Sequence, residues 1–423
     1  MSPALSLCRL CALSITGLVA GACLNGTELV SPPRVPVTSF TLEFRADSED
    51  LASATALGWA NGIPGVQVTL APEDSANGVP QVYQGSDSGT LTLGQLQAGR
   101  YRVDAVRWLT DAERARLPAG DDALGFVARI LLSTASASAR VPIGMVASRR
   151  KGLVISEWAF NIAAFVEVNE TYFFGGFLEL YNNADTTVYL DGLIIARGFS
   201  LGFDYPNYPC TLEAVFANDP QGIWAREVEQ FPGRGRDYPV RPGGLVLVAI
   251  DAIDHSRLIS RGLDLSHADF EFWGGPADID NPAVPNMIDT LALGHNGLGH
   301  GTVFQGLSSV AVLAHPYDLA TVPRQTGLTG EDYVRISAEQ IVDVVTLWPN
   351  YVSQYGPRCP QLVNSRFDRA SFDGRGYDEN VEYDYSISRR RVPVSGIGLP
   401  LLQRSRNSDA DFIRTLRSPG SIP

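Results

Sequence analysis

The segment from Asp264 to Asp289 is the most unusual stretch of the sequence for side chains that could do chemistry. Besides Trp273 it carries one imidazole and several carboxylates, namely Asp264, His267, Asp269, Glu271, Asp278, Asp280 and Asp289. Carboxylates with backbone carbonyls are the ligands that calcium prefers, and imidazole suits zinc. The segment has no Asp-x-Asp-x-Asp-Gly loop, so it is not an EF-hand.

Short polar residues beside proline and glycine also build turns, as in "DIDNPAVPN", and this structural interpretation is the favoured one. We expect the segment to lie at the surface of its domain, because buried unpaired carboxylates are costly. If the protein holds a calcium ion or a ligand, the candidate residues are Asp278, Asp280, His267 and Asp269. Asp278 and Asp280 lead because residues two apart in an extended stretch point the same way.

Two other motifs match a catalytic or a metal-binding pattern less well. "GFSLG" around Ser200 matches the Gly-x-Ser-x-Gly nucleophile elbow, but the elbow needs a following helix and "FDYPNYPC" cannot start one. "GHNGLGHG" places His295 and His300 in a glycine-rich loop without an acid between them, which is poor spacing for structural zinc. A phosphate-binding glycine loop, a Cys-x-x-Cys pair and a dinucleotide fingerprint are all missing from the sequence.

The composition indicates a globular chain with more than one domain. The chain has 423 residues, of which 45% are hydrophobic, and its 41 glycines and 27 prolines favour short strands joined by tight turns. The net charge is −13, and "RRR" at 389–391 is a single local run of basic residues. Nucleic acid is therefore excluded as a partner, because phosphate binding needs concentrated positive charge.

The N-terminus indicates export. Arg9 precedes a short apolar core, and the small residues Ala20, Gly21 and Ala22 lead to Cys23. This order resembles a bacterial lipobox, although Ala20 stands where leucine is usual. The resemblance implies that residues 1–22 are a signal peptide and that Cys23 is lipidated. The protein would then be anchored in the cell envelope, with the outer membrane as the expected location. The alternative is an ordinary signal peptide followed by an incidental cysteine.

Of the five cysteines, Cys8 and Cys11 would leave with the signal peptide and Cys23 would take the lipid. Cys210 and Cys359 remain, each beside proline, and an exported protein commonly joins such a pair in a disulfide. The alternative is two separate buried thiols.

Period-two alternation begins after a tether at residues 23–36. "TSFTLEFR", "PGVQVTLAPE" and "GRYRVDAVRW" each place apolar residues on one strand face. Thr110 and Glu113 form a capping box for one short helix before Pro118. With its Leu-x-x-Gly-x-Tyr motif at Leu96, the region 37–148 resembles a carboxypeptidase-regulatory-like, prealbumin-type β-sandwich.

A second domain is expected over residues 149–423. "FLELYNNADTTVYLDGLIIA" predicts a strand, an Asn- and Asp-rich turn at 182–185 and a return strand with a kink at "DG". Together with "ISE" at 155–157 this resembles a lamin-tail-type immunoglobulin-like sandwich. "RISAEQ" at 335–340 leaves a strand and a capped helix from Ser337 both open.

Several motifs in order, among them "LDLSHADFEFW", "IVDVV" and "RSRNSDADF", resemble a bacterial lipoprotein family catalogued as domain of unknown function 4876. The resemblance implies an all-β protein with a prealbumin-like front and a lamin-tail-like rear. The expected role is non-catalytic binding or scaffolding at the envelope, with another envelope protein or a transporter as partner and no cofactor other than calcium. The alternative is an extracellular hydrolase, metal-assisted or not, with a site that the motifs do not reveal.

Overall fold

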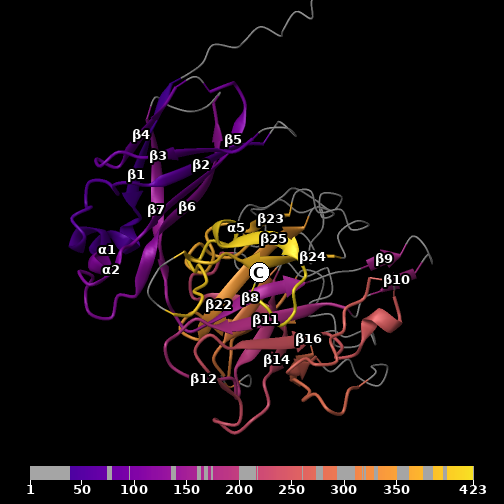
Figure 1. Ribbon diagram of the computed structural model, residues 1–423. Helices are drawn as coiled ribbons and strands as arrows, with labels where there is room; N and C mark the ends of the chain where they lie inside the picture. The colour runs from indigo at the N-terminus through magenta and orange to yellow at the C-terminus, as the bar shows by residue number, and fades with distance from the viewer. Residues whose placement is uncertain are drawn as a thin grey trace, which may run out of the picture.

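The protein is built from β-sheets gathered in two bodies. The computed structural model describes residues 39–422, except 74–78, 95, 135–139, 160–162, 166–169, 173–174, 200–215, 217, 260, 273–279, 293–309, 317, 319–320, 328–331, 350–361, 375–383 and 394–397. We call residues 40–149 the front unit and residues 153–422 the rear unit (Figure 1). The all-β prediction is confirmed, and in the described part of the chain no helix is long and apolar enough to cross a membrane.

The front unit is one curled sheet of seven strands in the order β3-β2-β5-β6-β7-β1-β4. Its strands are β1 (Phe40–Ala46), β2 (Gln67–Pro72), β3 (Gln81–Gln84), β4 (Thr90–Leu93), β5 (Arg100–Trp108), β6 (Ala123–Ser133) and β7 (Arg140–Arg149). All neighbours pair antiparallel except β1 and β7, which run parallel.

The predicted alternation in the front unit is confirmed. Phe40, Leu42 and Phe44 of β1 are buried, and β2 and β5 bury every second residue in the same core. Such a pattern is what a sheet with one covered face requires, because successive side chains point to opposite faces.

The predicted capping box is also confirmed. In α2 (Asp111–Arg114), Thr110 Oγ1 accepts a hydrogen bond from the Glu113 backbone, and the Glu113 carboxylate accepts one from the Thr110 backbone. A second helical turn was not predicted: η1 (Ser48–Asp50) continues into α1 (Leu51–Ala56), with Asp47 as the N-cap of η1. The acid cap followed by an alanine-rich run is the signal that sequence reasoning passed over.

The rear unit consists of two larger sheets and smaller pairs. The six-stranded sheet has the order β17-β16-β11-β8-β24-β25, and the eight-stranded sheet has the order β20-β21-β14-β13-β19-β22-β23, with β18 beside β14. The elements are β8 (Leu153–Ala159), β9 (Ala163–Phe165), β10 (Glu170–Tyr172), β11 (Phe177–Asn182), β12 (Val188–Tyr189), β13 (Ile194–Gly198), β14 (Gly222–Gln230), β15 (Pro239–Val240), β16 (Leu245–Ala249), η2 (His255–Arg257), β17 (Phe270–Glu271), β18 (Ile288–Ala292), β19 (Val310–Ala314), β20 (Arg324–Thr326), β21 (Asp332–Ser337), β22 (Ile341–Pro349), β23 (Phe372–Gly374), β24 (Tyr385–Arg389), α5 (Ser408–Asp411) and β25 (Phe412–Leu416).

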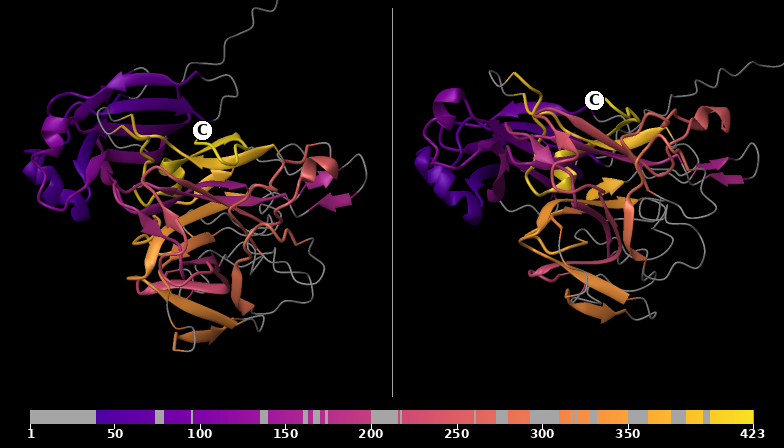
Figure 2. Two further views of the ribbon diagram at one scale, coloured as in Figure 1. Left: turned by 60° about the horizontal axis from the view of Figure 1, so that its bottom comes forward. Right: turned by 90° about the horizontal axis from the view of Figure 1, so that it is seen from below.

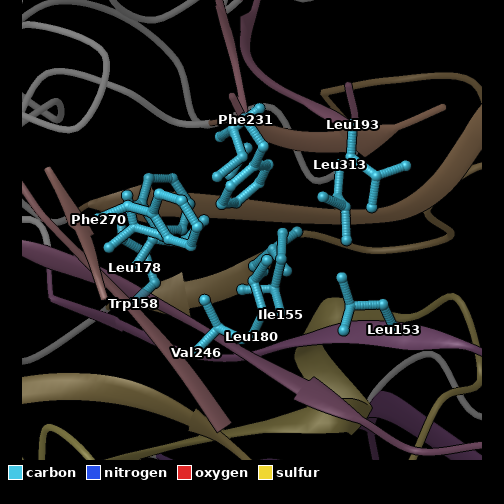
Figure 3. Close-up of a cluster of buried hydrophobic side chains, with 14 of the residues drawn as sticks. Leu153, Ile155, Trp158, Leu178, Leu180, Leu193, Phe231, Val246, Phe270 and Leu313 are labelled. Atoms are coloured by element: carbon cyan, nitrogen blue, oxygen red, sulfur yellow. The ribbon is translucent and has the colours of Figure 1, made fainter. Parts of the chain in front are cut away.

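The two large sheets pack face to face around one apolar core. Ile155, Trp158 and Leu180 enter it from the six-stranded sheet, and Ile195 and Leu313 enter it from the eight-stranded sheet. Figure 3 shows these layers meeting, with aromatic rings toward one end of the core and aliphatic side chains toward the other. Burial of this kind, at about 25 cal/mol per Å² of apolar surface, is the main force holding a sandwich together.

The hairpin predicted for "FLELYNNADTTVYLDGLIIA" is wrong. β11 pairs with β8 and β16, whereas β13 pairs with β14 and β19, so the segment crosses from one sheet of the sandwich to the other. Between them β12 pairs with β15 in a separate two-stranded sheet of the described chain, and Gly192 turns the chain at a φ of 74°. The Asn182 side chain donates hydrogen bonds to the carbonyls of Thr186 and Val240. The bends at residues 184–186 therefore begin a crossover to the other sheet.

The open question at "RISAEQ" is decided by the structure. β21 runs through Ser337, a turn occupies residues 338–340, and β22 follows. The segment is therefore a strand followed by a turn, and β21 and β22 pair with other strands of the sheet rather than with each other.

The two units are packed against each other, as all three views show (Figures 1 and 2). Arg369 Nη1 lies 2.8 Å from Asp47 Oδ2, and the Arg149 backbone donates to the Arg404 carbonyl at 3.0 Å. Leu124 of the front unit packs with Val392 and Leu401 of the rear unit. These contacts fix the end of the front unit at which β7 finishes.

Candidate functional site

The acid-rich segment predicted from the sequence covers the outer face of the six-stranded sheet. Leu265, Ala268 and Val284 are buried against Phe177 and Leu247 of that sheet. The three candidate residues that the structure describes, His267, Asp269 and Asp280, are exposed.

Most described carboxylates of this segment hold its own turns. Asp264 Oδ1 accepts from the Ser266 hydroxyl and backbone, and the side-chain hydrogen bond is the main cause that lowers the pKa of Asp264. Asp280 Oδ1 accepts from Asn286 Nδ2 at 2.8 Å. The buried Glu271 accepts from the backbone N–H groups of Ala252 and Asn281, at 2.9 and 3.1 Å.

Several sequence candidates lie outside the described residues, so the structure places no side chain for them. They are Cys23, Ser200, Cys210, Asp278, His295, His300 and Cys359. His255, the one histidine buried in the described chain, lies with Nε2 at 2.9 Å from the Asp251 carbonyl. Within the described residues, no group of three or more His, Cys, Asp or Glu side chains could hold a metal ion.

A cavity of about 490 Å³ adjoins the acid-rich segment at Asp269 and Phe270. We call it the loop pocket. Its lining is Leu190, Asp237, Tyr238, Pro239, Val240, Arg241, Gly244, Leu245, Val246, Asp269 and Phe270. Three separate stretches of chain therefore meet there, after β12, before and within β16, and at β17.

Asp191 fixes the loop that forms one wall of the loop pocket. Its Oδ1 accepts from the backbones of Gly235 and Asp237 at 3.0 and 2.8 Å, and its Oδ2 accepts from Tyr238 at 3.0 Å. Desolvation alone would raise the pKa of Asp191, but these backbone donors outweigh it and lower the pKa. An ionised carboxylate with three donors makes a stiff connection between β12 and the loop.

The floor and wall of the loop pocket are aromatic. The Phe270 ring meets the Tyr238 ring edge-on at 5.0 Å and the Phe231 ring at 5.0 Å. Phe270 is buried, whereas Tyr238 is only partly buried, and both residues line the cavity. Such a wall offers apolar contact area at little cost in side-chain entropy.

Polar groups stand around this aromatic floor. The Tyr238 hydroxyl and the exposed Arg241 guanidinium have no hydrogen-bond partner among the residues that the structure describes. Asp269 uses only Oδ2, which accepts from the Leu247 backbone at 2.9 Å. The pocket thus presents a hydroxyl, a cation and carboxylates above apolar rings, which is the usual make-up of a ligand site. The described residues that line it include no serine, cysteine or histidine.

Sequence reasoning found Asp269 and missed the rest of the loop pocket. The available signal was "FPGRGRDYPV" at 231–240, where glycines at positive φ alternate with charged residues. That stretch is an exposed loop whose partners lie about 30 to 50 residues away in sequence, and no local pattern pairs them.

A buried carboxyl pair lies on the outer face of the six-stranded sheet, where Glu157 of β8 stands opposite Glu179 of β11. Glu157 accepts from Ser386 Oγ at 2.6 Å and from the Ser418 backbone and hydroxyl at 2.9 and 2.7 Å. The chain after β25 therefore folds back over the two acids.

Glu179 accepts from Ser156 Oγ at 3.0 Å and from the Gly420 backbone at 2.7 Å. Burial raises its pKa to about 8, and the adjacent charge of Glu157 acts in the same direction. Burial also raises the pKa of Glu157, against the donors from Ser386 and Ser418. Because the pair is fully buried and closed by these donors, its role is to hold the chain end against the sheet.

Asp289 belongs to a third group of acids. It pairs with Glu229 across β18 and β14, and Glu227 lies on the same strand face two residues away. Burial, followed by the charges of Asp289 and Glu227, raises the pKa of Glu229 to about 8. Arg197 Nη1 lies 3.2 Å from Glu227 Oε1, so one acid of the group is ion-paired.

Comparison with known proteins gives a family match over part of the chain and no activity. The family model described as "Protein of unknown function (DUF4876)" matches residues 241–418. A crystal structure of a DUF4876 family protein from Bacteroides thetaiotaomicron is similar to this chain at 19% identity and a TM-score of 0.49, covering 91% of this chain and 95% of that one. No curated protein matches. The family resemblance drawn from sequence motifs is thus confirmed for the matched residues.

Proposed function

We propose that the protein is an exported, lipid-anchored binding or scaffolding protein of the bacterial cell envelope, without catalytic activity. In this proposal residues 1–22 are a signal peptide, Cys23 carries the lipid and residues 23–36 form a tether. A prealbumin-like domain at 37–148 then supports a lamin-tail-like domain at 149–423. The expected location is the outer membrane, with an envelope protein or a transporter as partner.

The observation that carries the binding role is the loop pocket. Its wall is fixed by Asp191, its floor is the Phe270 ring, and the Tyr238 hydroxyl and Arg241 guanidinium point to no described partner. Asp264 and Asp280 hold turns and the Glu157–Glu179 pair holds the chain after β25, whereas the loop pocket presents a hydroxyl and a guanidinium that could bind an external molecule. A rigid pocket wall that carries hydrogen-bond donors without a described partner favours ligand binding over catalysis.

Photo-crosslinking in cells tests the binding role. A crosslinking amino acid at Arg241 should give a discrete product in the envelope fraction, and the same amino acid at the exposed Arg257, which lies outside the pocket, should not. Tyr238→Ala in the same chain should remove the product. Identical product ladders at both positions, or hydrolysis of ester or glycoside substrates that depends on Asp269, would refute a non-catalytic binding role.

The anchor is tested separately by Cys23→Ser. The lipobox resemblance predicts that this change abolishes acyl labelling and moves the protein from the membrane fraction to the soluble fraction. A Cys23→Ser protein that stays membrane-bound, from a parent that takes no acyl label, contradicts the lipid anchor.

A further inference from the structure

The loop pocket is lined by charges of both signs that are not paired with each other. Asp237, Asp269 and Arg241 line the same cavity of about 490 Å³, and all three residues are exposed. Within the described part of the chain Arg241 has no ion pair, so neither aspartate neutralises its guanidinium. Opposite charges in one pocket attract each other, and here the fold keeps them apart.

Backbone donors hold the two aspartates in place. Asp269 Oδ2 accepts from the Leu247 N–H at 2.9 Å, and Asp237 Oδ2 accepts from the Arg234 N–H at 2.9 Å. The Oδ1 atom of each aspartate has no partner among the described residues. Each side chain therefore offers one carboxylate oxygen to a ligand while it keeps the hydrogen bond that positions it.

The apolar part of the lining belongs to the core of the sandwich. Leu190, Val240 and Val246 are between 2% and 5% exposed, and Phe270 is 2% exposed. The Phe270 and Tyr238 rings stand at 64° to each other, so they form no flat platform. A stacked ring such as a nucleobase needs a flat exposed face, whereas a compact apolar side chain also packs against rings set edge to face.

Neither a simple anion nor a simple cation matches this lining. An anion bound at Arg241 also meets the carboxylates of Asp237 and Asp269, and a cation bound at the carboxylates also meets the guanidinium. Like charges at close range cost free energy, and more so where water is displaced. A ligand with one anionic group, one cationic group and an apolar group meets each part of the lining with its complement.

We infer that the loop pocket binds a free α-amino acid with an apolar side chain, an inference that rests on the proposed binding function and names its ligand class. Arg241 binds the α-carboxylate, which a guanidinium can hold through two parallel hydrogen bonds. The open Oδ1 atoms of Asp269 and Asp237 bind the α-ammonium group. The ligand side chain lies against Phe270 and Tyr238. Three different contacts around one carbon atom also select its handedness.

Isothermal titration calorimetry with the chain from residue 23 carrying Cys23→Ser tests the ligand class with probes that share a phenyl group. L-Phenylalanine has both charges, phenethylamine lacks the carboxylate and 3-phenylpropanoate lacks the ammonium group. We expect L-phenylalanine to bind at least about tenfold more tightly than either analogue, because a hydrogen bond to a charged group contributes about that factor. D-Phenylalanine should bind more weakly than the L form.

Substitutions in the lining separate the two charge contacts. Arg241→Gln should weaken the binding of L-phenylalanine about tenfold and should not weaken that of phenethylamine, which has no carboxylate. Asp269→Asn keeps an oxygen for the Leu247 N–H, and it should weaken L-phenylalanine without weakening 3-phenylpropanoate. Arg234→Gln is the matched control, because Arg234 is exposed in the same loop and is not among the lining residues.

Several results would overturn the amino-acid site. They are no heat with L-phenylalanine or L-leucine, equal affinity for a single-charge analogue, equal losses in Arg241→Gln and Arg234→Gln, or heat with glucose in place of the amino acids. The binding role survives each of these results if the crosslinked product at position 241 still forms. Conversely, L-phenylalanine that binds and is recovered chemically altered contradicts the non-catalytic role and leaves the site in place.

Discussion

Glu179 should make the protein less stable as the pH rises through the neutral range. Its pKa is about 8 in the folded protein, against 4.5 for an ordinary glutamate, so the folded state binds a proton that the unfolded chain has released. Stability from this group is complete below about pH 4.5 and falls until about pH 8. Folding at pH 7 must then protonate the acid, which costs about 3 kcal/mol at 1.36 kcal/mol per pH unit.

Glu179→Gln removes this cost while keeping the shape of the side chain. At about pH 7 we expect the variant to be more stable than the parent by up to about 3 kcal/mol, with a smaller loss of stability between about pH 5 and about pH 8. Glu157→Gln should be less favourable than Glu179→Gln. The pKa of Glu157 is also raised by burial, but Glu157 accepts three hydrogen bonds from Ser386 and Ser418, and an amide nitrogen cannot accept those made to the oxygen that it replaces.

Urea unfolding followed by tryptophan fluorescence at several pH values gives these free energies, because the midpoint shifts with stability at constant slope. Asp185→Asn serves as the control, since the Asp185 side chain is 75% exposed and its nearest ion-pair distance is 4.0 Å. Glu229 and Asp368, with pKa values raised to about 8 and about 7, keep a residual slope of the same sign in every variant. The reasoning fails if Glu179→Gln and Glu157→Gln destabilise equally, or if the parent is equally stable at pH 5 and pH 8.

Three further predictions concern Asp191, the two cysteines and the acid-rich segment. Asp191→Ala should release the loop pocket wall, cost about 1–3 kcal/mol by leaving backbone donors unpaired, and raise amide hydrogen exchange at residues 235–238. Cys210 and Cys359 should appear as one cross-linked peptide in mass spectrometry without reductant, and two free thiols would contradict the pairing. Asp278→Asn with Asp280→Asn should abolish any calcium heat in calorimetry. If the parent shows neither calcium heat nor chelator-sensitive melting, the segment is purely structural.

The front unit was predictable because its strands bury one face. Phe40, Leu42 and Phe44 alternate with polar residues, so periodicity alone identifies β1 and its inward side. The same reasoning fails at β11, where Phe177 packs on one face and Leu178 on the other. Both faces are covered because the segment after β16 packs over the outer side of the sheet. Local turn residues then suggest a hairpin where the chain in fact crosses the sandwich.

The loop pocket was not predictable for a related reason. Asp191, Tyr238 and Phe270 are adjacent only because β12 pairs with β15 and β16 pairs with β17. Sequence reasoning weighs acids by their density along the chain, which selected the stretch from Asp264 to Asp289. In the structure, the role of each acidic side chain depends instead on which groups donate hydrogen bonds to it.

The hydrogen bonds that an acidic side chain accepts within the fold decide whether it is available to bind a ligand. The pKa of both Asp191 and Asp264 is lowered by nearby donors, so the carboxylate oxygens that accept these hydrogen bonds already have partners within the fold. Glu179 is buried with donors from two other segments, and moving it would release the chain end. Around the loop pocket, in contrast, Arg241 and the Tyr238 hydroxyl contribute nothing that the described fold requires. The polar groups of Arg241 and Tyr238 are not needed for stability, and the wall of the loop pocket that carries them is rigid. A binding protein of this architecture would therefore use these two side chains to recognise its ligand.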